Sequence, residues 1–398
     1  MQISSYINWK NVLGFSAAFY LGTYLHLRGG IAETPILLFG LFAFVVGLIK
    51  LRGKLLDGLS PNERWFVAAL FLFGAWSAFT VWLDDGAPSF YESPARFIVG
   101  SLIAIPIIKH RIDIRWVQLG AAISAILLIH LVVTTYSGGR FAPTMNATKW
   151  GNAIAFHALL CAALAIVSKP AHLRIVFALA AIFGIYSTAI TGTRGAILPV
   201  LLGLTYLAML SVRSVKGWTT IIAGLLVLAM IAPQIPIVKS RVLTTQHEVS
   251  RILNDDFNSS IGQRLTMWAA GFQAGLRSPI FGEGYDYEKT VDSFVAPSEG
   301  LSRAADRVAT AHSNHHSAYI DTLARSGFVG LALLIGMFFV TMRGGDYASR
   351  VLILAPGVGF VVAGISDSAL MLGITTSYFV VAGTILKATS HKDAGLDC

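Results

Sequence analysis

Three histidines stand within five residues of the segment AHSNHHSAYIDTLARSGFVGL, which covers residues 311–331. Such spacings first suggest a metal site. Zinc sites, however, use three or four ligands, commonly with cysteine or carboxylate among them, and no cysteine stands near His312, His315 or His316. We therefore expect no metal here, and we treat His312 and His315 first as loop residues.

His316 differs from its neighbours because an apolar stretch begins at it. His316, Ile320, Leu323 and Gly327 follow one face of a helix. A histidine in the first turn of a helix meets the positive end of the helix dipole, which favours the neutral imidazole. Neutral imidazole can act as a general base near pH 7. We predict that His316 is this base, with His315 as the alternative, because one residue of helix register decides which ring faces a substrate.

Two arginines suggest a site for an anionic ligand. Arg194, in TAITGTRGAILPV, stands in a short polar turn between two apolar runs. It can pair with a lipid headgroup phosphate or form part of a dedicated site for a phosphate-bearing ligand, to which a guanidinium is geometrically suited. Arg264 lies three residues after Ile261 and four before Trp268, so it borders an apolar helical face. It can cover apolar surface with its stem or, together with Arg194, bind a diphosphate.

Further polar residues allow two interpretations each. WLDDGAPSFYE contributes Asp84, Asp85 and Glu92, which could bind a divalent ion together with a phosphate substrate or form a solvated loop. GGRFAPTMNATKWGN adds Arg140 and Lys149, which could widen an anion-binding surface or lie at a membrane interface.

Three more charged residues lie in or beside the last apolar runs. Asp367, in GISDSAL, could orient a base or cap a helix. Asp321 and Arg325 stand four residues apart on one predicted helix, so we expect them to form an ion pair.

The elements that must position these residues are membrane helices. Of the 398 residues, 55% are hydrophobic and 13% are charged, with a mean hydropathy of +0.67, whereas soluble domains have roughly 25% charged residues. The net charge of +9 is spread in short clusters between apolar runs and therefore indicates topology and no nucleic-acid partner. We predict an all-α polytopic protein with about twelve spans. The spans are expected near 11–27, 33–50, 65–83, 94–108, 115–135, 150–168, 173–191, 194–212, 218–235, 316–341, 350–366 and 369–387.

The connections between these spans alternate in charge. KLRGKLLDGLSPNER, KHRIDIR, KPAHLR, VRSVK, RGGDYASR and the tail KATSHKD each hold at least two Lys or Arg. The positive-inside rule makes this set cytoplasmic, together with both termini. The chain then divides into helices over 1–235, a large external loop over 236–315, and helices with a cytoplasmic tail over 316–398.

The external loop is too long to be a mere connection. Within it, residues 259–285 predict an amphipathic helix that is capped by Ser259 or Ser260, ends near Pro279 and lies along the membrane surface. The following residues, 286–311, are mixed and polar and predict a loop or a short helix.

Three motifs in order resemble one family. HSAYIDTLARSGFVG has the pattern His, Ser, nine residues, Gly, two residues, Gly, from His316 to Gly330. This pattern resembles the signature of bacterial O-antigen ligases and the related polymerases and oligosaccharyltransferases. TGTRGA around Arg194 and GQRLTMWAAGFQAGLRSPIFGEGY around Arg264 are similar to other parts of the same domain. The segment with Arg140 has Asn146 but lacks the family's Asn-Pro-Asn stretch, which makes Arg140 a weaker correspondence than the other two arginines.

The resemblance implies a metal-independent, cofactor-free glycosyltransferase of the C-type membrane architecture in the bacterial inner membrane, with a periplasmic active site. The donor would be O-antigen linked to undecaprenyl diphosphate, and the acceptor would be lipid A–core, both within membrane lipids. Arg194 and Arg264, with Arg140, would hold the diphosphate, and His316 would deprotonate the acceptor hydroxyl. The alternatives are an O-antigen polymerase with the same donor and, in a different class, a transporter of lipid-linked glycan.

Overall fold

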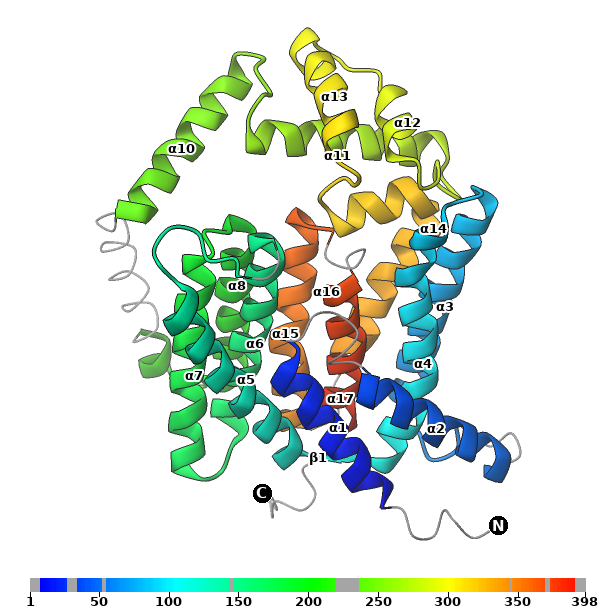
Figure 1. Ribbon diagram of the computed structural model, residues 1–398, viewed down its shortest axis with the longest axis vertical. Helices are drawn as coiled ribbons and strands as arrows, with labels where there is room; N and C mark the ends of the chain where they lie inside the picture. Colours follow the sequence, from blue (N-terminus) through cyan, green and yellow to red (C-terminus); the bar gives the residue numbers. More distant parts are fainter. Residues whose placement is uncertain are drawn as a thin grey trace.

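The computed structural model describes residues 8–26, 34–51, 55–143, 146–219, 236–343, 346–368 and 373–390. These ranges are almost entirely helical (Figure 1). The first half contains α1 (Trp9–Thr23), α2 (Thr34–Leu51), α3 (Pro61–Leu83), η2 (Pro88–Tyr91), α4 (Glu92–His110), β1 (Ile112–Asp113), α5 (Ile114–Thr135), α6 (Ala147–Val167), α7 (Ala171–Ile190) and α8 (Arg194–Ser211). The second half contains α10 (Pro236–Leu253), α11 (Ser260–Arg277), α12 (Tyr287–Asp292), α13 (Glu299–Ala311), α14 (Ala318–Met342), α15 (Tyr347–Ser366), α16 (Gly373–Ser377), the π-helix η5 (Tyr378–Ala382), α17 (Gly383–Ala388) and β2 (Thr389–Ser390).

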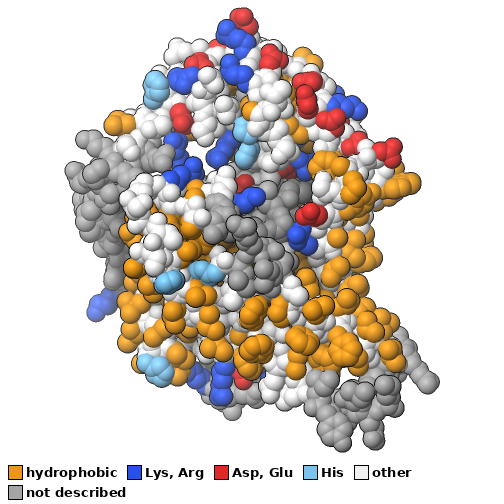
Figure 2. Space-filling view, viewed as in Figure 1, with side chains coloured by type: hydrophobic (Ala, Val, Ile, Leu, Met, Phe, Trp, Pro, Cys, Tyr) orange, Lys and Arg blue, Asp and Glu red, His pale blue; other side chains and the backbone are white. Residues whose placement is uncertain are grey.

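Eight helical segments in the described ranges are long and apolar enough to cross a membrane: α3, Pro88–His110, α5, α6, α7, α8, α14 and α15. Large apolar side chains remain exposed on their outer faces, for example Ile175, Leu179 and Ile182 of α7. Figure 2 shows hydrophobic side chains gathered in a belt across the lower part of the visible face. Lipid is the solvent that such a belt requires, so the chain is a multi-pass membrane protein.

The count of twelve spans is not reproduced within the described residues. α1 has only 15 residues, and α2 is a shorter apolar helix than a full span. The span expected at 218–235 lies almost wholly outside the described residues, as does the start of the one expected at 369–387.

α6 forms the centre of the bundle and packs against α7, α8 and α15. Its aromatic side chain Phe156 stacks on Phe360 of α15, with 3.7 Å between ring centroids. Small residues let the other neighbours approach closely, since a Cβ at Gly184 of α7 would lie 2.8 Å from Ala158. Such small-residue contacts are typical of helix packing in membranes, where apolar burial alone does not drive association.

Helices α10–α13, residues 236–311, form an upper layer over one end of the bundle (Figure 1). α11 begins as its sequence predicts, because the Ser259 side chain accepts a hydrogen bond from the Gly262 N–H. It ends at Arg277, just before Pro279. A small core holds α11, α12 and α13 together, formed by Met267, Ala270, Tyr287, Val291, Ala305, Val308 and Ala309.

The polar stretch after α11 is more helical than the predicted loop or short helix. α13 alone has 13 residues, and the Ser298 side chain caps it by accepting from the Leu301 N–H. Ala304, Ala305 and Val308 give α13 a narrow apolar face that packs on α11. This face was hard to recognise in the sequence because it consists mainly of alanines.

The observed helix α14 differs in two ways from the helix predicted over 316–341. It begins at Ala318, with the Ser317 side chain as its N-cap, so His316 precedes the helix. It is also broken at Gly327, where φ is 64° and ψ is −170°. In Figure 1 the upper part of α14 lies below α11 and the lower part descends beside α3.

The turn after α11 satisfies the backbone groups that this break releases. The Phe328 N–H donates to the Pro279 carbonyl at 2.7 Å, and the Glu283 N–H donates to the Ala324 carbonyl at 2.7 Å. A Cβ on Gly327 would lie 2.3 Å from the Ile280 carbonyl, so the close approach requires glycine as much as the positive φ does. The break thus joins the upper layer to the bundle by hydrogen bonds between backbones.

Candidate functional site

His315 is a buried anchor of the histidine loop. Its Nδ1 lies 2.9 Å from Asp321 Oδ1, and its backbone N–H donates to the same oxygen at 2.8 Å. The ring also lies edge-on to Tyr287 of α12, with 5.0 Å between centroids. Because the side chain is only 1% exposed, His315 connects α12 to α14 and turns away from open space.

Asp321 is the centre of a buried network. Besides His315, the Ser368 hydroxyl donates to its Oδ2, and Arg325 Nη2 lies 3.8 Å from its Oδ1. The predicted pair of Asp321 and Arg325 therefore exists, but the shorter contacts of the carboxylate are with His315 and Ser368. Arg325 also donates to the Ser313 carbonyl at 2.9 Å, which fixes the loop from its other side.

His316 has different neighbours from His315. Its backbone φ is 50°, and its Nε2 lies 3.4 Å from Nδ1 of His312, the C-cap residue that follows α13. Burial, and then the neighbouring charges of His312 and Arg264, lower the pKa of His316 to about 4. The neutral ring that the sequence predicted from a helix dipole is thus favoured here by desolvation, because His316 lies outside the helix.

Arg264 of α11 is half-buried beside these rings. It makes no hydrogen bond or ion pair with any residue of the described ranges. Its charge lowers the pKa of both His312 and His316, after burial as the main cause. A half-buried cation without a direct partner is unfavourable, and it is suited to receive an anion.

Arg194 is the first residue of α8 and lies near Arg264. Its Nη1 donates to Glu248 Oε2 at 3.2 Å and to the Thr245 hydroxyl at 3.0 Å, and its Nη2 donates to Glu248 Oε1 at 3.4 Å. The pKa of Arg264 is lowered by burial, with Asp367 opposing and Arg194 adding to the shift. Figure 2 shows Lys, Arg and His side chains gathered around a hollow between the upper layer and the hydrophobic belt.

Asp367 connects three elements below Arg264. Asn152 of α6 donates to its Oδ2 at 2.7 Å, and its carbonyl accepts from the N–H of Ala318, the first residue of α14. Burial raises the pKa of Asp367 to about 6, although the nearby charge of Arg264 opposes this shift. Asp367 therefore supports the start of α14 through its backbone carbonyl, and its carboxylate lies near the charge of Arg264; that it orients a base stays a prediction.

Arg140 supports the turn that carries Arg194. Its Nε donates to the Thr191 carbonyl at 2.9 Å and its Nη2 to the Thr193 hydroxyl at 3.4 Å. Thr193 in turn donates to the Ala147 carbonyl at the start of α6. These contacts fit a positioning role better than a direct ligand role.

Asp84 and Asp85 lie apart from the arginines, at the end of α3. Asp84 Oδ2 accepts from the Tyr285 N–H at 2.6 Å, and Asp85 has a φ of 48° in the turn that follows. Within the described ranges, no three His, Cys, Asp or Glu side chains are grouped so that they could hold a metal. Through its hydrogen bond with the Tyr285 N–H, Asp84 links the end of α3 to the turn after α11.

Sequence reasoning missed Glu248, Asn152 and Ser368. Glu248 and Thr245 stand three apart on α10 and so share a helical face, which is the only local sign of a common partner. Asn152 is buried on α6 among apolar residues, and a buried amide requires a polar partner. Nothing in the sequence distinguishes Ser368 from other serines near helix ends.

Comparison with protein-family models gives a match over part of the chain. The family model described as O-antigen ligase matches residues 177–335, a range that contains Arg194, Glu248, Arg264 and His316. No match was found among curated proteins. The match confirms the resemblance to O-antigen ligases. It supports an enzyme of the ligase or polymerase type, with lipid-linked glycan and lipid A–core as the general substrates of such enzymes.

Proposed function

We propose that this protein transfers O-antigen glycan from undecaprenyl diphosphate to a sugar hydroxyl of lipid A–core, at the periplasmic face of the bacterial inner membrane. Both chain termini would then be cytoplasmic. The observation that carries this proposal is the half-buried Arg264, which has no direct partner in the described ranges and lies beside a neutral histidine. Transfer from a diphosphate requires a cation that binds the anionic leaving group and, next to it, a base that deprotonates the acceptor hydroxyl.

The diphosphate would lie between Arg194 and Arg264. As the bond between the anomeric carbon and the diphosphate oxygen breaks, the leaving group takes the electron pair and gains negative charge. Positioned guanidinium groups stabilise this charge more in the transition state than in the ground state. These cations supply the electrostatic stabilisation that a divalent metal provides in other diphosphate enzymes, so we propose a metal-independent reaction.

His316 would act on the acceptor. The hydroxyl oxygen attacks the anomeric carbon from the side opposite the diphosphate, and the hydroxyl proton passes to the His316 imidazole, so the product is inverted at that carbon. His312 can share the proton, because its Nδ1 lies 3.4 Å from His316 Nε2. His315 and Asp321 position the loop and take no direct part, since both are buried in the contacts between α12 and α14.

Substitution of His316 by alanine tests the assignment. We expect the variant to remain in the membrane at the wild-type level and to lose transfer with purified donor and acceptor. The matched control is His172→Ala, which removes an exposed histidine at the start of α7. Wild-type transfer by the His316 variant would refute the role of this residue as the base.

Substitution of Arg194 by lysine tests the diphosphate site. The charge is kept and the two-pronged guanidinium geometry is lost, so we expect weaker donor binding with acceptor binding unchanged. Unaltered use of the donor would contradict the assignment of Arg194.

The second candidate function is the polymerase, which uses the same donor and a second lipid-linked repeat as acceptor. The family match favours neither activity. Deletion of the gene distinguishes them, because loss of a ligase leaves rough lipopolysaccharide and loss of a polymerase leaves core with a single repeat. A transporter is less well supported, since Arg194, Arg264 and His316 lie together next to the upper layer and away from the midplane of the spans.

A further inference from the structure

We propose that a second ligand site, separate from the cluster of Arg194, Arg264 and His316, binds a phosphorylated acyl lipid. It consists of a small polar cavity between α3 and α4 and an adjoining apolar groove between α2, α4 and η5.

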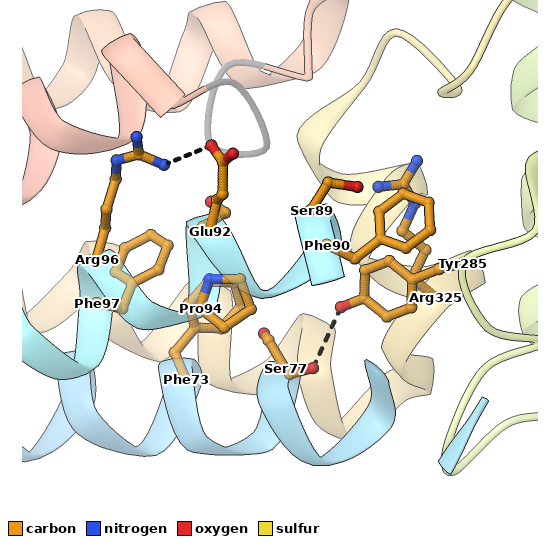
Figure 3. Close-up of a pocket in the computed structure, with 11 residues that line it drawn as sticks. Phe73, Ser77, Ser89, Phe90, Glu92, Pro94, Arg96, Phe97, Tyr285 and Arg325 are labelled. Carbon is orange, nitrogen blue, oxygen red and sulfur yellow. Dashed lines mark hydrogen bonds and ion pairs between the residues drawn. The ribbon is translucent and has the colours of Figure 1, made fainter. Parts of the chain in front are cut away.

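Two arginines give the polar cavity its charge (Figure 3). Arg96 of α4 pairs only loosely with the exposed Glu92, at 3.4 Å. Arg325 of α14 is 6% exposed, lies 3.8 Å from Asp321 and has its guanidinium 5.3 Å from the ring centroid of Tyr285. Hydroxyl groups of Ser77 and Ser89 also line the cavity. Its volume of about 80 Å³ suits a single phosphate and is too small for a chain of sugars.

The groove provides the apolar part of the site. It has a volume of about 270 Å³ and is lined by Val99 and Gly100 of α4 and by Val380 and Val381 of the π-helix η5. Glu92 and Arg96 line both the cavity and the groove, so one amphiphilic molecule can occupy the two together. π-Helical turns are rare and often occur at functional sites.

A buried hydroxyl without a partner indicates which kind of amphiphile fits. Ser377 lines the groove and is 2% exposed, and its Oγ has no hydrogen-bond partner among the residues that the structure describes. A buried hydroxyl normally donates to an acceptor. The ester or amide carbonyl of an acyl chain supplies that acceptor, whereas a prenyl chain has none. The site therefore fits an acyl lipid with one phosphate.

The second site is connected to the histidine loop. Arg325 lines the cavity, donates to the Ser313 carbonyl and faces the carboxylate of Asp321 that holds His315. An anion bound at Arg325 would therefore stabilise the loop that presents His316. If the proposed function holds, the lipid at this site is the anchor of the acceptor, and this last step rests on that function.

Lipid binding to the purified full-length protein tests the site without any transfer reaction. Phosphatidic acid is the probe, and native mass spectrometry counts the bound molecules. Diacylglycerol with the same acyl chains shows whether binding requires the phosphate, and inorganic phosphate shows whether binding requires the acyl chains. The variant Arg96→Gln removes a cation, and Val99→Trp fills the groove. The matched controls are Arg115→Gln, an exposed arginine on α5, and Val176→Trp, an exposed valine on α7.

We expect phosphatidic acid to bind at least about tenfold more tightly than diacylglycerol and inorganic phosphate, since a charge-assisted contact of this kind corresponds to about one order of magnitude in affinity. Arg96→Gln and Val99→Trp should each lose about this factor, and the two controls should lose none. Equal binding of phosphatidic acid and diacylglycerol, full binding of inorganic phosphate alone, or equal loss in the controls would overturn the site.

Kinetics separate this proposal from the proposed function. With an active enzyme, Arg96→Gln should raise the KM for acceptor and leave the KM for donor unchanged, and a change confined to the donor would overturn the acceptor assignment. If the wild-type protein shows no transfer at all, the proposed function fails, while selective binding of phosphatidic acid still supports the site.

Discussion

Glu248→Gln should increase the affinity of this protein for its donor. In the structure both terminal nitrogens of the Arg194 guanidinium donate to the Glu248 carboxylate, Nη1 to Oε2 at 3.2 Å and Nη2 to Oε1 at 3.4 Å. A diphosphate that binds Arg194 must displace this carboxylate or share the arginine with it. Glutamine keeps the shape of the side chain and removes its charge, so it competes less strongly for Arg194.

The size of the effect follows from the exposure of the pair. The side chain of Arg194 is 34% exposed and that of Glu248 is 10% exposed, so the pair is neither fully solvated nor deeply buried. Exposed pairs contribute about 0.2–1 kcal/mol, and hydrogen bonds to charged groups about 1.5–3 kcal/mol. We take about 1 kcal/mol for the contact that the donor must replace, which corresponds to about fivefold in affinity.

A transfer assay with labelled lipid-linked donor measures the effect as a fall in donor KM. The acceptor KM should not change, and Glu288→Gln, an exposed substitution on α12, serves as the control for the loss of one negative charge. The gain should also vanish when Arg194 is replaced by glutamine, because the competition then has no target. An unchanged donor KM in Glu248→Gln would refute the reasoning, and a raised donor KM would in addition indicate that Glu248 orients Arg194 for binding.

Three further substitutions test the framework of the site. Gly327→Ala should lower the melting temperature of the detergent-solubilised protein, because this backbone conformation, with φ of 64° and ψ of −170°, costs a residue other than glycine about 1–3 kcal/mol before the backbone clash is added; Gly336→Ala, whose Cβ would meet nothing within 4 Å, should not lower it. Asp321→Asn should destabilise the protein by about 3 kcal/mol, the low end for a broken buried ion pair, as measured by thermal unfolding, and stability equal to wild type would contradict its central role. The donor KM should rise as the pH increases through about 6, because Asp367 then becomes an anion facing Arg264 and repels the diphosphate, whereas His316, with a pKa of about 4, stays neutral throughout. Asp367→Asn should flatten this dependence in a series of donor KM values from about pH 5 to about pH 8, and a persistent rise would exclude Asp367 as its cause.

Local patterns predicted much of this molecule. The apolar runs predicted the spans of α3 to α8, and the spacing of Ile261, Leu265 and Trp268 predicted α11 with its Ser259 cap. These features depend on neighbours within a few residues, which a sequence displays directly. The motifs around Arg194, Arg264 and His316 were likewise recognisable, and the family match covers all three.

Contacts between distant segments could not be predicted in this way. The break at Gly327 exists because the turn at 278–284 supplies the missing hydrogen bonds, and the partner of Arg194 lies 54 residues away at Glu248. The two adjacent histidines illustrate the same limit. Whether His315 or His316 is buried depends on Asp321 and on Tyr287 of α12, and the sequence does not show where α12 will lie.

The break at Gly327 also bears on how deep the proposed site would lie in a bilayer. The lower part of α14, from Phe328 to Met342, rises only about 22 Å at 1.5 Å per residue, which is less than the hydrocarbon thickness of about 30 Å. The turn at 278–284 would therefore have to complete the crossing, and its exposed Ile280 and Phe281 side chains are suited to contact acyl chains. If the proposed function holds, the site around Arg264 and His316 would lie close to this turn at the level of the lipid headgroups, where a diphosphate and an acceptor sugar could meet while both of their lipid tails remain in the membrane.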